Sequence, residues 1–233
     1  MRGTFYGIGV GPGDPELLTI KAANILKTVD VIIAPKTEKK EGSVAFNIAK
    51  PYLRDDIEIV YQVFPMVKGF ADNNSDAWEQ NKNEIVALLD AGKNVAFLTL
   101  GDAMFYSTYI YVFRLLEKAG IPIETIPGIP AFVAIGSHLN WPIVEGDDVL
   151  SVIPATASPE RVKEAIKAAD NVVIMKVYKN FAEIAATLKE CDMIDKAVMV
   201  SRCGLPDEER IDDIEARAQQ PVNYLSTVLA RKR

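Results

Sequence analysis

Aromatic and hydroxyl side chains crowd behind a glycine–aspartate pair near the middle of the chain. Gly101 and Asp102 end an apolar run over 95–100. The residues that follow within six positions are Phe105, Tyr106, Ser107 and Thr108. Gly101 lets a ligand approach the backbone because it has no Cβ, and such side chains at a helix start can enclose a flat ligand and hydrogen-bond its edge. Asp102 is equally well explained as a cap of the helix expected over 104–119.

A glycine-rich turn over 7–14 follows the first predicted strand and precedes a helix. Its spacing is wrong for a dinucleotide fingerprint, because a frame that starts at Gly7 has Pro12 in the last glycine position. Pro12 also lacks the N–H that would contact a pyrophosphate. A nucleotide-dependent oxidoreductase is therefore a weaker alternative. The turn either only joins a strand to a helix, or it lines a cleft at the carboxyl end of a parallel sheet.

The sulfur and imidazole side chains do not suggest a metal centre. Cys191 and Cys203 lack the Cys-x-x-Cys spacing of metal ligands and are expected to be reduced thiols. His138 is the only histidine. It follows an apolar helix, which favours a structural or surface role, with a lone contact to a metal-bearing substrate as the alternative. No cluster of histidine, cysteine and carboxylate residues predicts a protein-bound metal.

The elements that must position these residues alternate between strand and helix, which indicates parallel α/β structure. The first part has expected strands at 4–9, 31–34, 57–63, 95–100 and 123–126. It has expected helices at 17–27, 43–52, 76–91 and 104–119. Pro35 is expected to end the second strand. Prolines and glycines at 127–130 predict a passage between two α/β domains, 1–128 and 129–233.

The pattern resumes in the second part. Strands are expected at 149–153, 172–177, 197–201 and 224–230. Helices are expected at 159–169 and 181–191. The acidic stretch 208–219 reads as a surface helix or a long loop.

Composition is that of an ordinary globular protein. The chain of 233 residues is long enough for two domains. Of its residues, 49% are hydrophobic and 25% are charged, a composition too apolar for disorder. The formal charge of −6 counts against a nucleic-acid partner but not against an anionic small substrate. No apolar run reaches the length of a membrane span, and no signal sequence is apparent. A soluble cytoplasmic protein is expected.

Three segments together resemble the tetrapyrrole methylase family. They are the glycine-rich segment 9–19, Leu-Gly-Asp at 100–102 and the proline–glycine turn 127–131. The second signature usually continues with proline, and Ala103 departs from that pattern. With its spacings the resemblance covers the chain from near residue 5 to its end. Within the family, 101–109 is most similar to the branch that methylates C20 of precorrin-2 or cobalt-factor II.

The resemblance implies two α/β domains with an interdomain cleft, S-adenosylmethionine in that cleft and a homodimer. It implies a cofactor site made of Gly101, Asp102, Phe105, Tyr106, Ser107, Thr108, Pro130, Ala131, Lys176, Val177, Tyr178, Cys203, Leu225, Ser226 and Thr227. A tetrapyrrole bears many carboxylates, so its expected contacts include cations. The substrate site is expected to include Gly11, Pro12, Gly13, Asp14, Lys36, Lys39 and Lys40. Weaker cationic candidates are Arg2, Lys176, Lys179 and Arg202.

Methyl transfer from a sulfonium is an in-line displacement, so positioning carries most of the catalysis. A proton must leave C20 afterwards, and Asp102, Tyr106 or an ordered water can accept it. Three alternatives stay open: methylation of a different ring carbon, a non-catalytic ligand-binding relative, and either a metal-free or a cobalt-containing acceptor.

Overall fold

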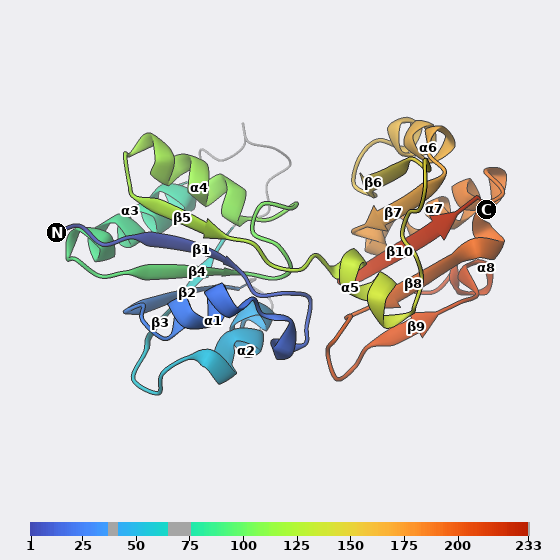
Figure 1. Cartoon of the computed structure of the whole chain (residues 1–233). Helices are drawn as coiled ribbons and strands as arrows, with labels where there is room; N and C mark the ends of the chain where they lie inside the picture. The colour runs from blue at the N-terminus through green and yellow to red at the C-terminus, as the bar shows by residue number, and fades with distance from the viewer. Residues whose placement is uncertain (37–41, 65–75, 233) are drawn as a thin grey trace. The chain divides into compact units, whose positions relative to one another are not determined.

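The computed structural model describes residues 1–36, 42–64 and 76–232. They form two compact units, Met1–Pro130 and Ala131–Arg233, each built on its own five-stranded sheet (Figure 1). The division falls two residues after the one expected from the sequence. Among the described residues, no helix is both long and apolar enough to cross a membrane.

The sheet of the first unit is entirely parallel, with strand order β3-β2-β4-β1-β5. Its strands are β1 (Phe5–Gly9), β2 (Val31–Lys36), β3 (Glu58–Val63), β4 (Val95–Thr99) and β5 (Ile123–Ile126). The central strands are apolar throughout because helices cover both faces, and every residue of β4 is buried.

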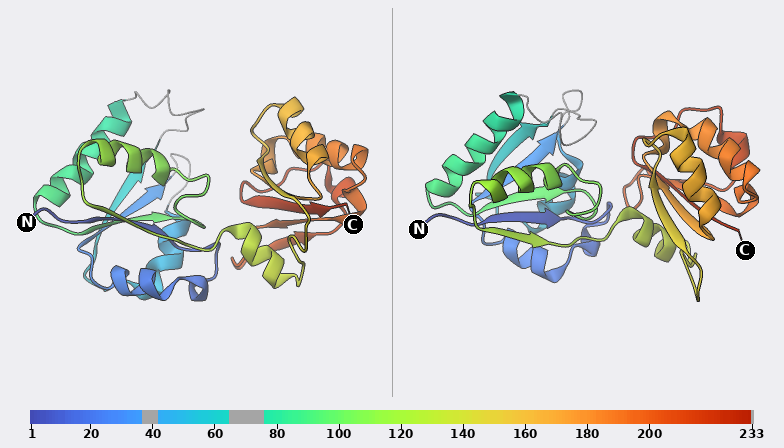
Figure 2. Two further views of the ribbon diagram at one scale, coloured as in Figure 1. Left: turned by 45° about the horizontal axis from the view of Figure 1, so that its top comes forward. Right: turned by 90° about the horizontal axis from the view of Figure 1, so that it is seen from above.

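Two pairs of helices cover the two faces of this sheet (Figure 2). The helices are α1 (Ile20–Leu26), α2 (Val44–Ala49), α3 (Asp76–Asp90) and α4 (Tyr109–Lys118). Helices α1 and α2 share a core with Ile8 and Leu98, whereas α3 and α4 share one with Phe5 and Phe97. The chain therefore leaves the neighbouring strands β1 and β4 toward opposite faces. In open α/β sheets such a switch point, at the carboxyl ends of the strands, is where ligands bind.

The sheet of the second unit is mixed, with strand order β6-β7-β10-β8-β9. Its strands are β6 (Leu150–Pro154), β7 (Asn171–Met175), β8 (Ala197–Ser201), β9 (Glu209–Ile211) and β10 (Ser226–Arg231). Its helices are α5 (Ala131–His138), α6 (Pro159–Ala168), α7 (Phe181–Glu190) and α8 (Ile214–Arg217). Strand β10 is antiparallel to both β7 and β8. Its first residues therefore lie beside the last residues of those two strands.

Three expectations about the elements are wrong. Strand β2 does not end at Pro35, which pairs with Gln62 of β3 within the parallel ladder. Helix α4 begins at Tyr109, five residues later than expected, because Tyr106 has a left-handed φ of 48° that no helix accommodates. The stretch 208–219 contains the short strand β9 as well as the helix α8. A strand of three residues is too short for an alternating pattern to reveal it.

Three backbone segments approach one another closely at the carboxyl edge of the first sheet. A Cβ built on Gly128, after β5, would lie 2.2 Å from the Gly101 carbonyl oxygen and 2.6 Å from the Gly9 carbonyl carbon. A Cβ on Gly9 would lie 2.5 Å from the Gly128 nitrogen. These are backbone atoms that cannot move aside as a side chain can. Glycine at 9 and 128 is therefore a packing requirement.

Replacement of Gly128 by alanine should destabilise the protein by on the order of 3 kcal/mol, because the new methyl group must force two strand ends apart. Gly120→Ala is the control: its φ is 67°, but a Cβ there meets nothing within 4 Å, so only the left-handed backbone costs energy, about 1 kcal/mol. Urea denaturation followed by circular dichroism measures both. Equal losses for the two variants would contradict the close approach.

Candidate active site

The carboxyl ends of β1 and β4 are joined by a two-way backbone bridge. The Gly101 N–H donates to the Gly11 carbonyl at 2.8 Å, and the Gly11 N–H donates to the Gly101 carbonyl at 3.1 Å. Gly101 has a φ of 73°, a conformation that glycine adopts without strain. A Cβ there would meet only Ile129 and Pro130 backbone atoms at 3.9 Å. A methyl group at 101 would therefore meet no steric clash, but the left-handed backbone there would be strained.

Asp102 ties two strand-end loops together through its carboxylate. Oδ1 accepts the Met104 N–H at 2.8 Å, and Oδ2 accepts the Gly128 N–H at 2.9 Å. The expected capping of the long helix is wrong, since α4 starts after Thr108, which itself makes no capping hydrogen bond. Both carboxylate oxygens are engaged with backbone donors. Asp102 thus fixes the loop after β4 to the loop after β5.

Phe105 and Tyr106, expected in a helix, lie in an irregular loop. Their rings meet edge to face with centroids 4.9 Å apart, and Tyr106 is 43% exposed. The Ser107 hydroxyl donates to the carbonyl of Ala103, whose methyl group is buried in the core. Thr108 is exposed. Ala103 and Ser107 therefore anchor the loop to the core, and the rings of Phe105 and Tyr106 form an aromatic pair on it.

Helix α4 is fixed to the sheet by its first residue. The Tyr109 ring is fully buried, and its hydroxyl lies 2.6 Å from Oγ1 of Thr125 on β5. Burial raises the pKa of Tyr109, so this phenol stays neutral and its hydrogen bond persists across the physiological range. The aromatic loop is consequently held at both ends, by Asp102 and by Tyr109.

Thr99, the last residue of β4, carries an unsatisfied polar atom. Its side chain is 8% exposed, and its Oγ1 has no hydrogen-bond partner. Buried hydroxyls in native proteins are almost always paired, with protein or with ordered water. A polar group of water or of a ligand at this edge would satisfy it. No sequence pattern indicated this unsatisfied hydroxyl, since a threonine at the end of an apolar strand is ordinary.

The glycine-rich turn lies at the same edge, because it follows β1. Gly11 forms the bridge to β4, and Gly11, Pro12 and Gly13 are buried. Asp14 accepts the Glu16 N–H at 2.8 Å and so caps the short 3-10 helix Pro15–Leu17. Its carboxylate has a local structural role that the sequence analysis did not assign.

Lys36 and Arg2, two of the cationic residues considered for substrate contacts, lie at opposite ends of the first sheet. Lys36 ends β2 at the carboxyl edge, is exposed and lies 5.8 Å from the Tyr61 ring. Lys39 and Lys40 lie outside the described residues. Arg2 is misplaced for a substrate contact: it precedes β1, at the amino end of the parallel sheet, and pairs with Asp90 at 2.5 Å.

In the second unit, three of the expected residues lie at the same end of neighbouring strands, which we call an edge of the sheet. Lys176 follows β7, Arg202 follows β8 and Leu225 precedes β10. The register pairs Thr227 with Met175 and Ser226 with Ser201, so the three lie at the same end. Lys176 and Arg202 have left-handed φ values of 61° and 57°. Burial lowers the pKa of the Lys176 ammonium.

The other residues of the second unit that were expected to contact the cofactor differ in which of their atoms a ligand could reach. The Val177 side chain is fully buried in the core, so only its backbone can meet a ligand. The Tyr178 ring contacts the Tyr224 ring edge to face, with centroids 5.0 Å apart. Ala131 begins α5, and Pro130 precedes it, at the division between the units.

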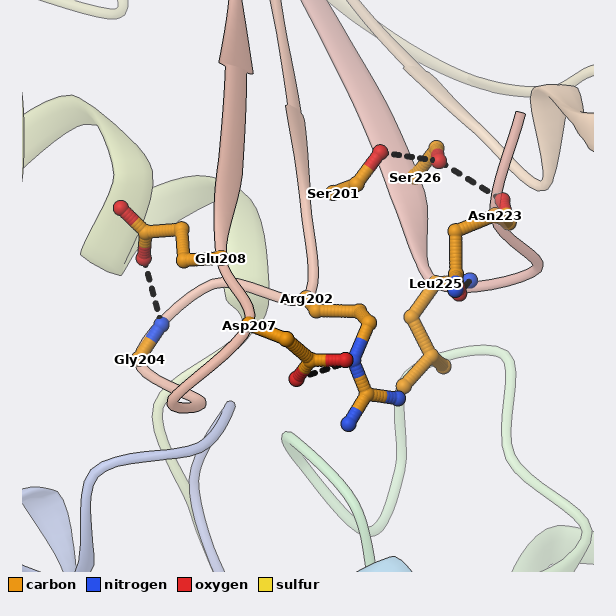
Figure 3. Close-up of polar contacts among 8 residues, drawn as sticks. All are labelled: Ser201, Arg202, Gly204, Asp207, Glu208, Asn223, Leu225 and Ser226. Atoms are coloured by element: carbon orange, nitrogen blue, oxygen red, sulfur yellow. Dashed lines mark hydrogen bonds and ion pairs between the residues drawn. The ribbon is translucent and has the colours of Figure 1, made fainter.

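Cys203 belongs to a small polar cluster around Glu208. Glu208 accepts the Gly204 N–H at 2.6 Å and lies 3.2 Å from Nε2 of His138 (Figure 3 shows the Gly204 contact). Burial, and secondarily Glu208, raises the pKa of the Cys203 thiol to about 12. His138 thus pairs with a carboxylate at the end of α5, in line with a structural role.

The comparisons with known proteins bear on this arrangement. Residues 4–216 match the family model described as tetrapyrrole (corrin/porphyrin) methylases. The chain belongs to the tetrapyrrole methylase family. The family's signature segments are the ones that meet at the carboxyl edge of the first sheet, at Gly11, Gly101 and Gly128.

Three relatives of the tetrapyrrole methylase family align over nearly the whole chain. The cobalt-precorrin-2 C(20)-methyltransferase of Salmonella typhimurium is 36% identical over 100% of this chain and 98% of its own. The probable cobalt-precorrin-2 C(20)-methyltransferase of Methanocaldococcus jannaschii is 36% identical, covering 97% and 95%. The precorrin-2 C(20)-methyltransferase of a Sinorhizobium species is 32% identical, covering 97% and 94%.

Solved tetrapyrrole methylases share the fold. The cobalt precorrin-4 methyltransferase CbiF superposes with a TM-score of 0.76 at 19% identity, covering 98% of this chain and 94% of its own. The uroporphyrin-III C-methyltransferase of Thermus thermophilus complexed with S-adenosyl homocysteine gives 0.74 at 20% identity, covering 99% and 98%. The expected fold of two α/β domains is confirmed.

Within this tetrapyrrole methylase, Ala103 replaces the usual proline without breaking the loop. The two hydrogen bonds of Asp102 use the N–H groups of Met104 and Gly128, neither of which belongs to residue 103. The substitution therefore leaves the connection between the two loops intact.

Cys203 should resist alkylation in the folded protein. At pH 8 a thiol with a pKa near 12, compared with the ordinary 9.0, has a thiolate fraction about a thousandfold smaller. Cys191 is half-buried and serves for comparison. Peptide mass spectrometry after iodoacetamide treatment should find label on Cys191 first, and on both residues only after unfolding in guanidinium. Equal labelling of both in the folded protein would contradict the burial of Cys203.

Proposed function

We propose that this protein transfers a methyl group from S-adenosylmethionine to C20 of a precorrin-2-type tetrapyrrole in cobalamin biosynthesis. The observation that carries the proposal is the near-complete alignment with three relatives named for C20 methylation. The two relatives with the higher identity, 36% against 32%, are named for the cobalt form. We therefore expect the cobalt-containing acceptor to be the better substrate.

The residues present fit S-adenosylmethionine. The carboxyl end of the first sheet offers the aromatic pair Phe105–Tyr106 and the unsatisfied Thr99 hydroxyl. An adenosyl group needs a flat apolar contact together with a few polar partners, and these residues supply both. When bound, the cofactor supplies an electrophilic methyl group on a sulfonium. The resemblance also implies cofactor contacts from the backbone at 176–178 and 225–227 of the second unit.

The chain's own contribution to the reaction is positioning. Asp102 holds the aromatic loop to the loop after β5, because each of its carboxylate oxygens accepts a hydrogen bond from a backbone N–H. The candidates for the acceptor of the C20 proton are Asp102, Tyr106, whose side chain is partly exposed, and a water molecule. Lys36, at the end of β2, is suited to a substrate carboxylate. We also expect a homodimer, as the resemblance implies, and a cytoplasmic location.

The deciding experiment is an anaerobic incubation with S-adenosylmethionine bearing a CD3 group and with either cobalt-containing or metal-free acceptor. One CD3 group added at C20, located by NMR after mass spectrometry, is the expected product, with faster turnover of the cobalt form. Addition at another carbon would replace the proposed position. Binding of S-adenosylhomocysteine without transfer to either acceptor would favour the non-catalytic alternative.

Asp102→Asn should reduce methyl transfer about 30-fold, equivalent to about 2 kcal/mol. An amide places one N–H₂ group against either the Met104 or the Gly128 N–H, so one of the two loop contacts is lost. Asp213→Asn is the matched control: Asp213 accepts only the Ala216 N–H, at 2.8 Å, and an amide oxygen preserves that bond. Steady-state rates for both variants, with denaturation midpoints, separate loop position from global stability. An Asp102→Asn variant as active as the control would exclude the positioning role.

A further inference from the structure

The loop after β8 and the turn before β10 are tied together at the edge of the second sheet (Figure 3). The residues that make the connection form what we call the edge clasp: Ser201, Arg202, Asp207, Asn223 and Ser226. Ser201 and Ser226 are cross-strand partners at the ends of their strands. None of the sequence patterns pointed to Ser201, Asp207 or Asn223. Ser201 contacts a residue 25 positions away in the chain, whereas the contacts of Asp207 and Asn223 depend on how their own loops fold.

The buried part of the clasp is a chain of hydroxyl groups. Ser201 and Ser226 are 1% and 2% exposed, and their Oγ atoms lie 2.7 Å apart. Oγ of Ser226 also lies 2.6 Å from the Asn223 carbonyl oxygen. A carbonyl only accepts, so the single hydroxyl hydrogen of Ser226 is donated to Asn223. Ser201 must then be the donor to Ser226, which fixes the direction of the whole chain.

The second part of the clasp acts through Arg202. Its N–H donates to the Leu225 carbonyl at 2.9 Å, and its Nε lies 2.5 Å from Oδ1 of Asp207. The side-chain contact lacks hydrogen-bond geometry and is an ion pair. The Arg202 carbonyl accepts the Leu205 N–H at 2.9 Å, which closes the loop after β8 into a turn. Arg202 therefore holds a left-handed backbone in place from both sides.

Leu225 is held by two members of the clasp, Arg202 and Asn223. Its carbonyl accepts from Arg202, and its N–H donates to Oδ1 of Asn223 at 2.9 Å. With both peptide groups engaged, the orientation of Leu225 depends on the clasp. The Ser226 hydroxyl, for its part, is buried and occupied, so it has no hydrogen left to donate to a ligand.

We propose that the edge clasp positions Leu225 for S-adenosylmethionine, and that Ser201 and Ser226 are positioning residues rather than cofactor contacts. The inference rests on the proposed function, which sets the cofactor against Leu225–Thr227. It adds that affinity for the cofactor depends on two hydroxyls that do not touch it. When the turn before β10 is less ordered, the cofactor binds more weakly, because part of the binding free energy is then needed to order the turn again.

Calorimetric titration with S-adenosylhomocysteine tests the proposal without requiring turnover. Ser201→Ala should raise Kd about fivefold, the equilibrium weight of one neutral hydrogen bond. Ser226→Ala should raise it more, by about tenfold, because it removes the acceptor of Ser201 and the donor to Asn223. The double variant should match Ser226→Ala alone, since Ser201 has no partner in that background.

Asp207→Asn should raise Kd only about twofold, since Asp207 is 62% exposed and its ion pair is screened. Asp212→Asn is its control, because Asp212 pairs with Arg210 at 2.7 Å beyond the opposite end of β9 and should leave Kd unchanged. In the methyl-transfer assay, KM for S-adenosylmethionine should rise with Kd, whereas kcat and the KM of the tetrapyrrole should not change.

Two results would overturn this assignment in distinguishable ways. Wild-type affinity in the two serine variants, together with lowered melting temperatures, would make the clasp a purely structural feature and leave the proposed function standing. No binding of S-adenosylhomocysteine by the unmodified protein would overturn the cofactor assignment itself, and with it the role of the clasp.

Discussion

The approach of bare backbone to bare backbone at Gly9, Gly101 and Gly128 is the constraint on which the first unit depends. It brings the ends of β1, β4 and β5 within contact distance, closer than any side chain permits. Only at that distance can one carboxylate, Asp102, accept N–H groups from two different loops. The aromatic loop is thus positioned by two features: the close backbone packing at the three glycines and the carboxylate of Asp102.

Backbone strain is concentrated where the proposed chemistry is. In the described part of the chain, five non-glycine residues have left-handed φ values, and three of them, Tyr106, Lys176 and Arg202, lie in loops at the candidate strand-end edges. Each costs about 1 kcal/mol or more and persists only if its surroundings hold it. The surroundings do so through Tyr109 and Asp102 for Tyr106, and through the edge clasp for Arg202.

Apolar runs and glycine punctuation predicted most of the fold, because strands such as β4 are buried on both faces and read plainly in the sequence. The same reasoning missed the start of α4, since the φ of Tyr106 is set by tertiary contacts. In the candidate site, Gly101 and Asp102 were predictable from their local pattern. Ser201, Asp207 and Asn223 were not: the Ser201 contact comes from pairing between strands β8 and β10, and the contacts of Asp207 and Asn223 depend on how the loops beside these strands fold.

The two strand-end edges reach a fixed shape by opposite means, and this decides what each tolerates. At the first edge, glycines permit the close approach, so an added methyl group is the damaging change. At the second edge, buried hydroxyls and an ion pair make the connection, so removal of a side-chain atom is the damaging change. A backbone packed against itself has little freedom to adjust to a ligand, whereas a turn held by side chains can be ordered to different degrees. If the edge clasp has the proposed role, the second edge is therefore where a small substitution changes affinity for the cofactor.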